Sequence, residues 1–105
     1  MKFRVIGAMD WFTIDAPTPK IAIAFTTILG KELSLEKDGK IIKPQWAGND
    51  WFIKEFGTSR VKFLESVEEK DLIGVAQSFQ IDLPNYISEL YQNDVNNFLA
   101  AWRKE

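Results

Sequence analysis

The sequence contains neither cysteine nor histidine among its 105 residues. Without cysteine the chain has no disulfide, no thiolate nucleophile and no Cys-ligated metal site. Without histidine it lacks the usual general base near neutral pH and the commonest transition-metal ligand, which leaves proton transfer to carboxylates, lysine, tyrosine and hydroxyl groups. We therefore expect a protein that is not an enzyme, and we predict no catalytic, cofactor-binding or metal-ligating residue.

The sequence also has no large excess of either sign of charge and no long hydrophobic run. The 13 Lys and Arg residues face 15 Asp and Glu residues, and the net charge of −2 gives no general attraction to phosphates. No apolar run approaches the roughly 18 residues of a membrane span, and the N-terminal segment has a charge within its short apolar run and no small-residue cleavage site. We expect a cytoplasmic protein that does not bind membranes.

Glycine-rich fingerprints are absent as well, because the chain has only six glycines and no G-x-G-x-x-G, Walker or G-x-S-x-G pattern. What is present is a high content of hydrophobic residues, 46%. A chain of this length and composition can bury a core of its own, so we expect one domain, residues 1–105.

The first half of the chain has the pattern of an antiparallel sheet. Short apolar segments at 3–6 and 9–14 predict two strands or one bent strand. Segment 32–37 alternates cleanly, Asp38-Gly39 has the composition of a two-residue type I′ turn, and Lys40–Lys43 reads as the return strand. These segments predict an N-terminal sheet of four to six strands.

Two further segments complete this predicted sheet. In 20–29 large residues alternate with Ala and Thr, and the β-branched residues favour a strand over a helix. The helical alternative stays open, with Thr18 as N-cap, Pro19 as first helical residue and Gly30 as the stop. In 60–64, Val61 and Phe63 lie on one side of a predicted half-exposed strand.

The second half of the chain has helical spacing. A capping-box pattern begins at Ser66 and precedes an apolar stripe, which predicts a helix at 67–79. Asp82 is a second candidate N-cap, and the apolar spacing after it predicts a helix at 84–103. Asp94 falls on that stripe, so either this helix breaks there or Asp94 has a partner. Strands followed by helices predict an α+β fold with two C-terminal helices packed on the sheet.

The segment between the two halves, 45–57, holds two Trp and two Phe around Gly48-Asn49-Asp50. Within it, 47–56 resembles the Ala-Gly-x-Asp-Trp-Phe run that opens a helix in the helix-turn-helix segment of centromere-protein-B and pogo-like transposases. The basic stretch expected after that run is not found at 57–65. The resemblance implies a short helix at 50–56 with Asn49 as N-cap, as the alternative to a strand.

The chain has fourteen aromatic residues, four of them Trp, which exceeds what a core of this size needs. Trp102 lies on a helical stripe and is expected in the core. The other three Trp residues follow no periodic face, and Trp is enriched at the centres of protein interfaces. The predicted partner-binding residues are those Trp and their neighbours in the central segment: Trp11, Trp46, Asn49, Asp50, Trp51 and Phe52.

These observations favour a small non-enzymatic protein-binding module. Small acidic domains of this kind are often inhibitors, immunity proteins or phage-type accessory proteins, which is an analogy and not a derivation. Self-association is a further possibility if 3–6 or Lys40–Lys43 lies unpaired at an edge of the sheet.

Two other functions compete with this hypothesis. The first is binding of single-stranded nucleic acid, with Trp46 and Trp51 stacking on bases and Lys40, Lys43 and Lys54 flanking them. The second is Mg²⁺-dependent hydrolysis by a pair of the carboxylates that lie beside aromatic residues, which are Asp10, Asp15, Asp50 and Glu55. Nothing in the sequence fixes the spacing of those carboxylates, so we consider hydrolysis the least favoured of the three.

Overall fold

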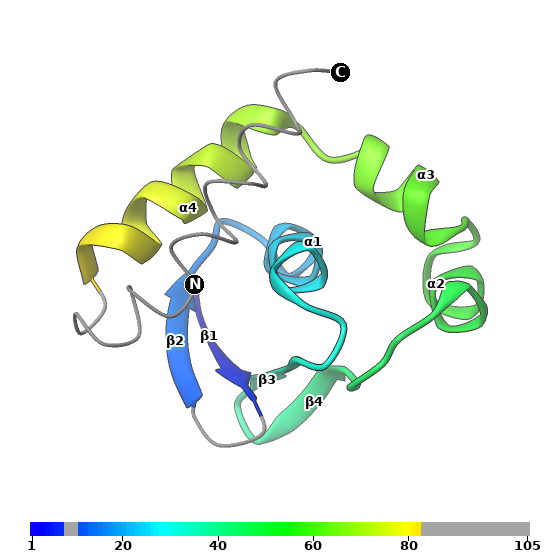
Figure 1. Cartoon of the computed structure of the whole chain (residues 1–105), viewed down its shortest axis with the longest axis horizontal. Helices are drawn as coiled ribbons and strands as arrows, with labels where there is room; N and C mark the ends of the chain where they lie inside the picture. The colour runs from blue at the N-terminus through cyan, green and yellow to red at the C-terminus, as the bar shows by residue number, and fades with distance from the viewer. Residues whose placement is uncertain (8–10, 83–105) are drawn as a thin grey trace.

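The computed structural model describes residues 1–7 and 11–82 (Figure 1). Its four strands are β1 (Lys2–Ile6), β2 (Trp11–Asp15), β3 (Ser34–Lys37) and β4 (Lys40–Lys43). Its four helices are α1 (Pro19–Leu29), α2 (Asn49–Phe56), α3 (Arg60–Glu65) and α4 (Glu69–Asp82). The strands form one antiparallel sheet in the order β2-β1-β3-β4, and the predicted α+β fold is confirmed.

The sheet buries one face and leaves the other open. Along β1, Phe3 and Val5 are buried, whereas Lys2 and Arg4 are exposed, because successive side chains of a strand point to opposite faces. The helices lie on the buried face: α4 packs against α1 and β2, and α1 packs against β3 (Figure 1). The edges of the sheet are β2 and β4. Of the two segments considered for self-association through an edge, Lys40–Lys43 lies at an edge of the described sheet, whereas 3–6 belongs to β1, which pairs with a strand on each side.

The predicted hairpin is present. Asp38 and Gly39 have φ angles of 53° and 82°, the left-handed values that a type I′ turn requires at both central positions. Past the turn the pairing is irregular, since Glu36 faces Ile41 but Leu35 faces Lys43. Ile42 is therefore an extra residue on β4, a β-bulge.

Segment 20–29 is a helix, and the predicted strand was wrong. The open alternative describes α1 correctly: the Thr18 hydroxyl accepts from the Ile21 N–H at 3.2 Å, Pro19 begins the helix, and Gly30 is its C-cap. The buried hydroxyls of Thr26 and Thr27 each donate to the carbonyl four residues earlier, at 2.8 and 2.7 Å. A helix buried on nearly every side has no polar face, so its sequence shows no helical period.

The predicted strand at 60–64 was also wrong, because α3 occupies it. The Ser59 hydroxyl accepts from the Lys62 N–H at 3.3 Å and caps the helix. In a helix Val61 and Phe63 do not share a face, and Phe63 is buried while Val61 is 57% exposed. Segment 50–56 falls in α2, as the resemblance implies, but its N-cap is Gly48 and not Asn49.

The predicted helix at 67–79 corresponds to α4, which begins at Glu69, and Ser66, the predicted N-cap, is the C-cap of α3. The Ser66 hydroxyl donates instead to the Phe63 carbonyl at 2.7 Å, at the C-terminal end of α3. The predictions for 84–103, Asp94 and Trp102 lie outside the described residues. None of the described helices is both long and apolar enough to cross a membrane.

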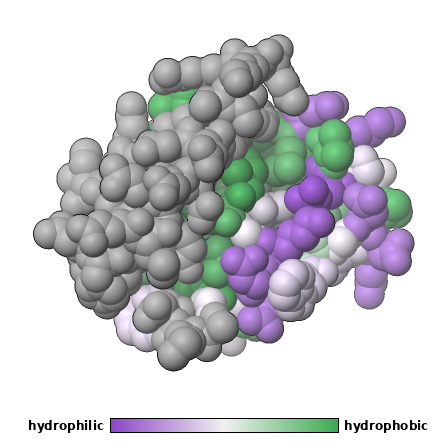
Figure 2. All heavy atoms as spheres, in the orientation of Figure 1, coloured by the Kyte–Doolittle hydropathy of each residue, from purple (hydrophilic) through white to green (hydrophobic). Residues whose placement is uncertain are grey.

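Helices α2 and α3 lie on the side of α1 that is away from β2 (Figure 1). On the face seen in Figure 2, hydrophilic and hydrophobic residues are mixed on that side of the molecule. The large hydrophobic side chains that these two helices expose are Ile53 and Val61. Isolated apolar residues of this kind are normal on a protein surface and indicate no site by themselves.

Candidate functional site

Trp46 is the most exposed of the large hydrophobic residues in the part of the chain that the structure describes, at 69%. It lies in the connection between β4 and α2, and its φ of 57° places the backbone in the left-handed region. That conformation is rare for a bulky side chain and costs roughly 1–2 kcal/mol. The Trp46 N–H donates to the Lys31 carbonyl at 2.6 Å, which joins this connection to the segment before β3.

Lys43 lies beneath this connection and is fully buried. Its ammonium donates to the Leu33 carbonyl at 2.7 Å and to the Pro44 carbonyl at 3.4 Å. Burial lowers the pKa of Lys43 from 10.5 to about 8; the nearby Glu32 carboxylate raises this pKa, and the Arg60 guanidinium lowers it. The bulge explains the burial, because it places Lys43 opposite Leu35 on the core face of the sheet.

Asn49 and Asp50 form the first turn of α2, and both are exposed. The Asn49 side-chain oxygen accepts from the Arg60 N–H at 3.1 Å and so ties the start of α3 to the start of α2. Asp50 places a negative charge near the positive end of the helix dipole of α2. The positions of both side chains thus have a structural explanation.

Trp51 and Phe52 turn inward from α2. Phe52 is fully buried, and Trp51 is half-buried with its ring at 90° to that of Phe52 and a centroid separation of 4.9 Å. Phe56 and Phe63 extend this aromatic cluster, with a centroid separation of 4.4 Å between them. The cluster joins α2 to α3, so Phe52 belongs to the core and offers no surface to a partner.

Trp11 lies elsewhere, on the open face of the sheet at the edge strand β2. It is 59% exposed, and the Arg4 guanidinium lies 4.6 Å from the centre of its ring. Arg4 also lies 3.9 Å from the Glu36 carboxylate on β3. Trp11 lies in the edge strand β2, whereas Trp46 lies in the connection that follows β4 at the other edge, so they are two separate exposed positions.

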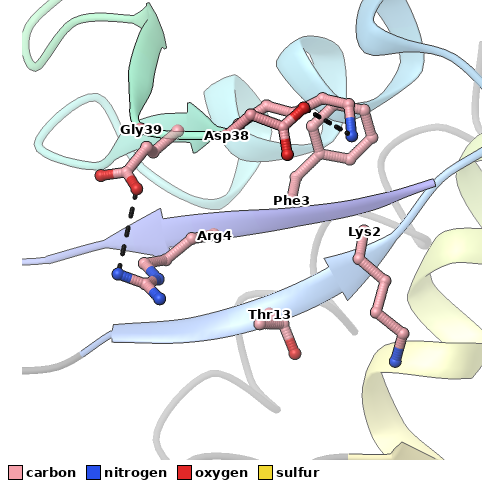
Figure 3. Close-up of a pocket in the computed structure, with 8 residues that line it drawn as sticks. Lys2, Phe3, Arg4, Thr13, Asp38 and Gly39 are labelled. Carbon is pink, nitrogen blue, oxygen red and sulfur yellow. Dashed lines mark ion pairs between the residues drawn. The ribbon is translucent and has the colours of Figure 1, made fainter.

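A shallow hollow of about 270 Å³ borders this open face, between β1, β2 and the hairpin turn (Figure 3). Lys2, Arg4 and Thr13 extend from one face of the strands, whereas Phe3 lies on the other (Figure 3). Two ion pairs line the hollow, Arg4 with Glu36 at 3.9 Å and Lys37 with Asp38 at 3.7 Å. Because those charges already face one another, the hollow has no single sign of charge for a ligand.

The carboxylates that suggested a metal site are not gathered together. Asp15 accepts from the N-terminal ammonium at 3.1 Å, Asp50 and Glu55 belong to α2, and Asp10 lies outside the described residues. Within residues 1–7 and 11–82, no three carboxylates lie close enough to one another to hold a metal ion.

Of the six predicted partner-binding residues, Trp11 and Trp46 are exposed at separate places, Asn49 and Asp50 form a surface turn, Trp51 is half-buried and Phe52 is buried. Sequence reasoning missed the role of Lys43, because a lysine at the end of a strand reads as an exposed residue and nothing in the pattern indicates the bulge. Comparison of the chain with family models, with curated proteins and with solved structures gives no match.

Proposed function

We propose that the chain is a small non-enzymatic protein-binding module whose contact surface includes Trp46. The observation that carries this proposal is the combination of high exposure and left-handed backbone at that one residue. Backbone strain persists only where the surrounding structure holds it, and it is concentrated at functional positions. An exposed Trp gains nothing for the core, but at an interface it can contribute several kcal/mol of binding free energy.

The neighbours of Trp46 suit this role. Asn49 and Asp50 begin α2 three and four residues later and present polar groups at the rim, as interface surfaces commonly do. Trp51 and Phe52 hold α2 in place through the aromatic cluster and so support the surface from below. We keep Trp46, Asn49 and Asp50 as proposed contact residues, with Trp11 as a separate second position.

The experiment is affinity capture from a lysate of the source cells with three forms of the protein: native, Trp46→Ala and Trp11→Ala. Both substitutions remove one exposed Trp and leave the aromatic cluster of α2 intact. We expect the same protein to be recovered by native and Trp11→Ala and to be lost, by at least about tenfold, with Trp46→Ala. Equal recovery by all three forms would remove Trp46 from the proposed surface.

Binding of single-stranded nucleic acid is the competing proposal, and the structure changes which residues it can use. Lys43 is buried, which leaves Lys40 and Lys54 as the exposed lysines of the predicted set, and Trp51 is half-buried. A titration of the native protein with unlabelled oligonucleotides at low salt distinguishes the two proposals. Affinity that falls steeply with added salt and depends on Trp46 would favour nucleic acid over a protein partner.

A further inference from the structure

Two hydrogen bonds join the connection that contains Trp46, and the end of β4 before it, to the segment before β3. The Trp46 N–H donates to the Lys31 carbonyl, and the Lys43 ammonium donates to the Leu33 carbonyl two residues farther along. The same ammonium lies 3.4 Å from the Pro44 carbonyl, which belongs to the connection itself. One buried lysine side chain therefore joins both chain segments on which the position of Trp46 depends.

The bulge at Ile42 turns the Lys43 side chain toward the core, where it reaches the Leu33 and Pro44 carbonyls. In a regular strand Ile41 and Lys43 would share a face, because residues two apart point the same way. Ile41 is 55% exposed opposite Glu36, whereas Lys43 faces the core opposite Leu35. β-Bulges commonly re-aim a side chain in this way.

We infer that Lys43 is the positioning residue of the Trp46 surface, a buried tie whose strength depends on whether its amine carries a proton. This inference rests on the proposed function for its biological meaning, because Trp46 is the residue that it positions. The tie itself involves no partner and can be measured on the protein alone.

The direction of the pH dependence follows from burial. Within the tie the pKa of Lys43 is lowered to about 8, whereas a Lys43 side chain released to water has its ordinary value of 10.5. The released state therefore binds the proton more tightly, so acidification from pH 10.5 to pH 8 weakens the tie. The charged groups facing the amine are Glu32, which raises its pKa, and Arg60 at the start of α3, which lowers it.

The experiment labels the Trp residues of the full chain with 5-fluorotryptophan and follows their ¹⁹F NMR resonances from pH 7 to pH 10.5. Trp46→Phe and Trp51→Phe variants assign the two resonances that matter. In the native protein we expect the Trp46 resonance to shift with an apparent midpoint near pH 8, the pKa of the tied amine. In Lys43→Met the shift should vanish and the Trp46 resonance should move toward that of a free side chain at every pH.

Two controls separate positioning from general damage. Lys40→Met removes an exposed lysine from the same strand and should leave the titration unchanged. The Trp51 resonance reports the aromatic cluster and should stay at its native position in Lys43→Met. A native-like Trp46 resonance in Lys43→Met, or a native protein whose Trp46 resonance does not change over this range, would overturn the inference.

If Lys43→Met does not fold, the native protein still provides a test. Its lysines are labelled with ¹³C at Cε and titrated over the same range. One lysine should titrate near pH 8 together with the Trp46 resonance. The absence of any lysine titrating more than about one pH unit below the ordinary value would overturn the inference. Either failure would leave the capture result with Trp46→Ala standing, so the two proposals fail separately.

Discussion

The side chain of Trp46 is large and hydrophobic, yet it is exposed to solvent. Its backbone has a conformation that glycine adopts more readily than tryptophan. Its φ of 57° brings Cβ close to the neighbouring carbonyl, a cost that glycine does not have. Asp38 adopts a similar φ in the hairpin, but Asp is tolerated there because it is a short polar residue within a turn. Trp46 also lies in a turn, with Gln45, but its side chain is neither short nor polar, and this mismatch of residue and backbone is the residue-scale basis of the proposal.

This strain can be measured without a partner. We predict that Trp46→Gly is more stable than Trp46→Ala by about 1 kcal/mol, because alanine keeps the Cβ that the left-handed backbone disfavours. Urea unfolding of the two variants provides the measurement. The matched control is Lys54 in α2, where the order should reverse and Ala should be more stable than Gly by a similar amount. The same order at both positions would contradict strain at Trp46.

Lys43 gives a second prediction at this scale. Its pKa is about 8 in the folded protein and 10.5 when unfolded, so between these pH values the unfolded chain holds a proton that the folded chain has lost. The free energy of unfolding should therefore rise with pH across that window, by on the order of 2–3 kcal/mol.

Urea unfolding of native protein and Lys43→Met at pH 7.5, 9 and 10.5, taken as a difference, isolates this effect from other titrating groups. A difference that is constant or falls with pH would show that Lys43 is not held in a desolvated site.

At the scale of elements, the hairpin could be predicted and α1 and α3 could not, for physical reasons. The hairpin carries its turn chemistry in two adjacent residues, Asp38 and Gly39. Helix α1 is buried nearly all round, so only its caps, Thr18 and Gly30, distinguish it from a strand. Helix α3 is six residues long and too short to show a period, so its sequence signal is the Ser59 N-cap. In both helices the capping residues indicated a helix, whereas the hydrophobic pattern did not.

Helix α4 contains a glycine without a packing reason. Gly74 is exposed, and among the described residues a methyl group added to it would have no heavy atom within 4 Å outside its immediate surroundings. Gly74→Ala should therefore raise the free energy of unfolding by about 0.5–1 kcal/mol through lower unfolded-state entropy. Gly57→Ala is the opposite control, because φ there is 74° and the substitution should destabilise by about 1 kcal/mol. Thermal or urea unfolding measures both, and a destabilising Gly74→Ala would contradict the regular helix at that position.

At the scale of the whole molecule, the sequence predicted the fold class and the position of the connection between the two halves. It could not predict which side chains of that connection and of α2 are exposed. Which aromatic residues point outward depends on how α2 turns around its axis, which placed Phe52 in the core and left Trp51 half-buried. The position of Lys43 depends on one bulged residue in β4. Both outcomes come from tertiary packing, which local patterns do not contain.

Self-association through the edge strand β4 is a whole-molecule prediction that the structure makes less favourable. The strand is only four residues long, carries a bulge and begins with an exposed lysine, all of which oppose the addition of another strand. We expect one elution volume in size-exclusion chromatography at two widely separated protein concentrations. A shift to larger size at the higher concentration would show that β4 or another surface pairs between copies.

The central claim is that a partner protein contacts the surface around Trp46, and site-specific photo-crosslinking tests it most directly. A benzophenone side chain is placed at Asp50, which is exposed near Trp46 in sequence, or at Ile41, which is 55% exposed on the open face of the sheet. Both forms keep Trp46 and the core intact. The account predicts that the captured protein crosslinks to position 50 and not to position 41. Crosslinking at position 41 alone would contradict it and would assign binding to the open face of the sheet.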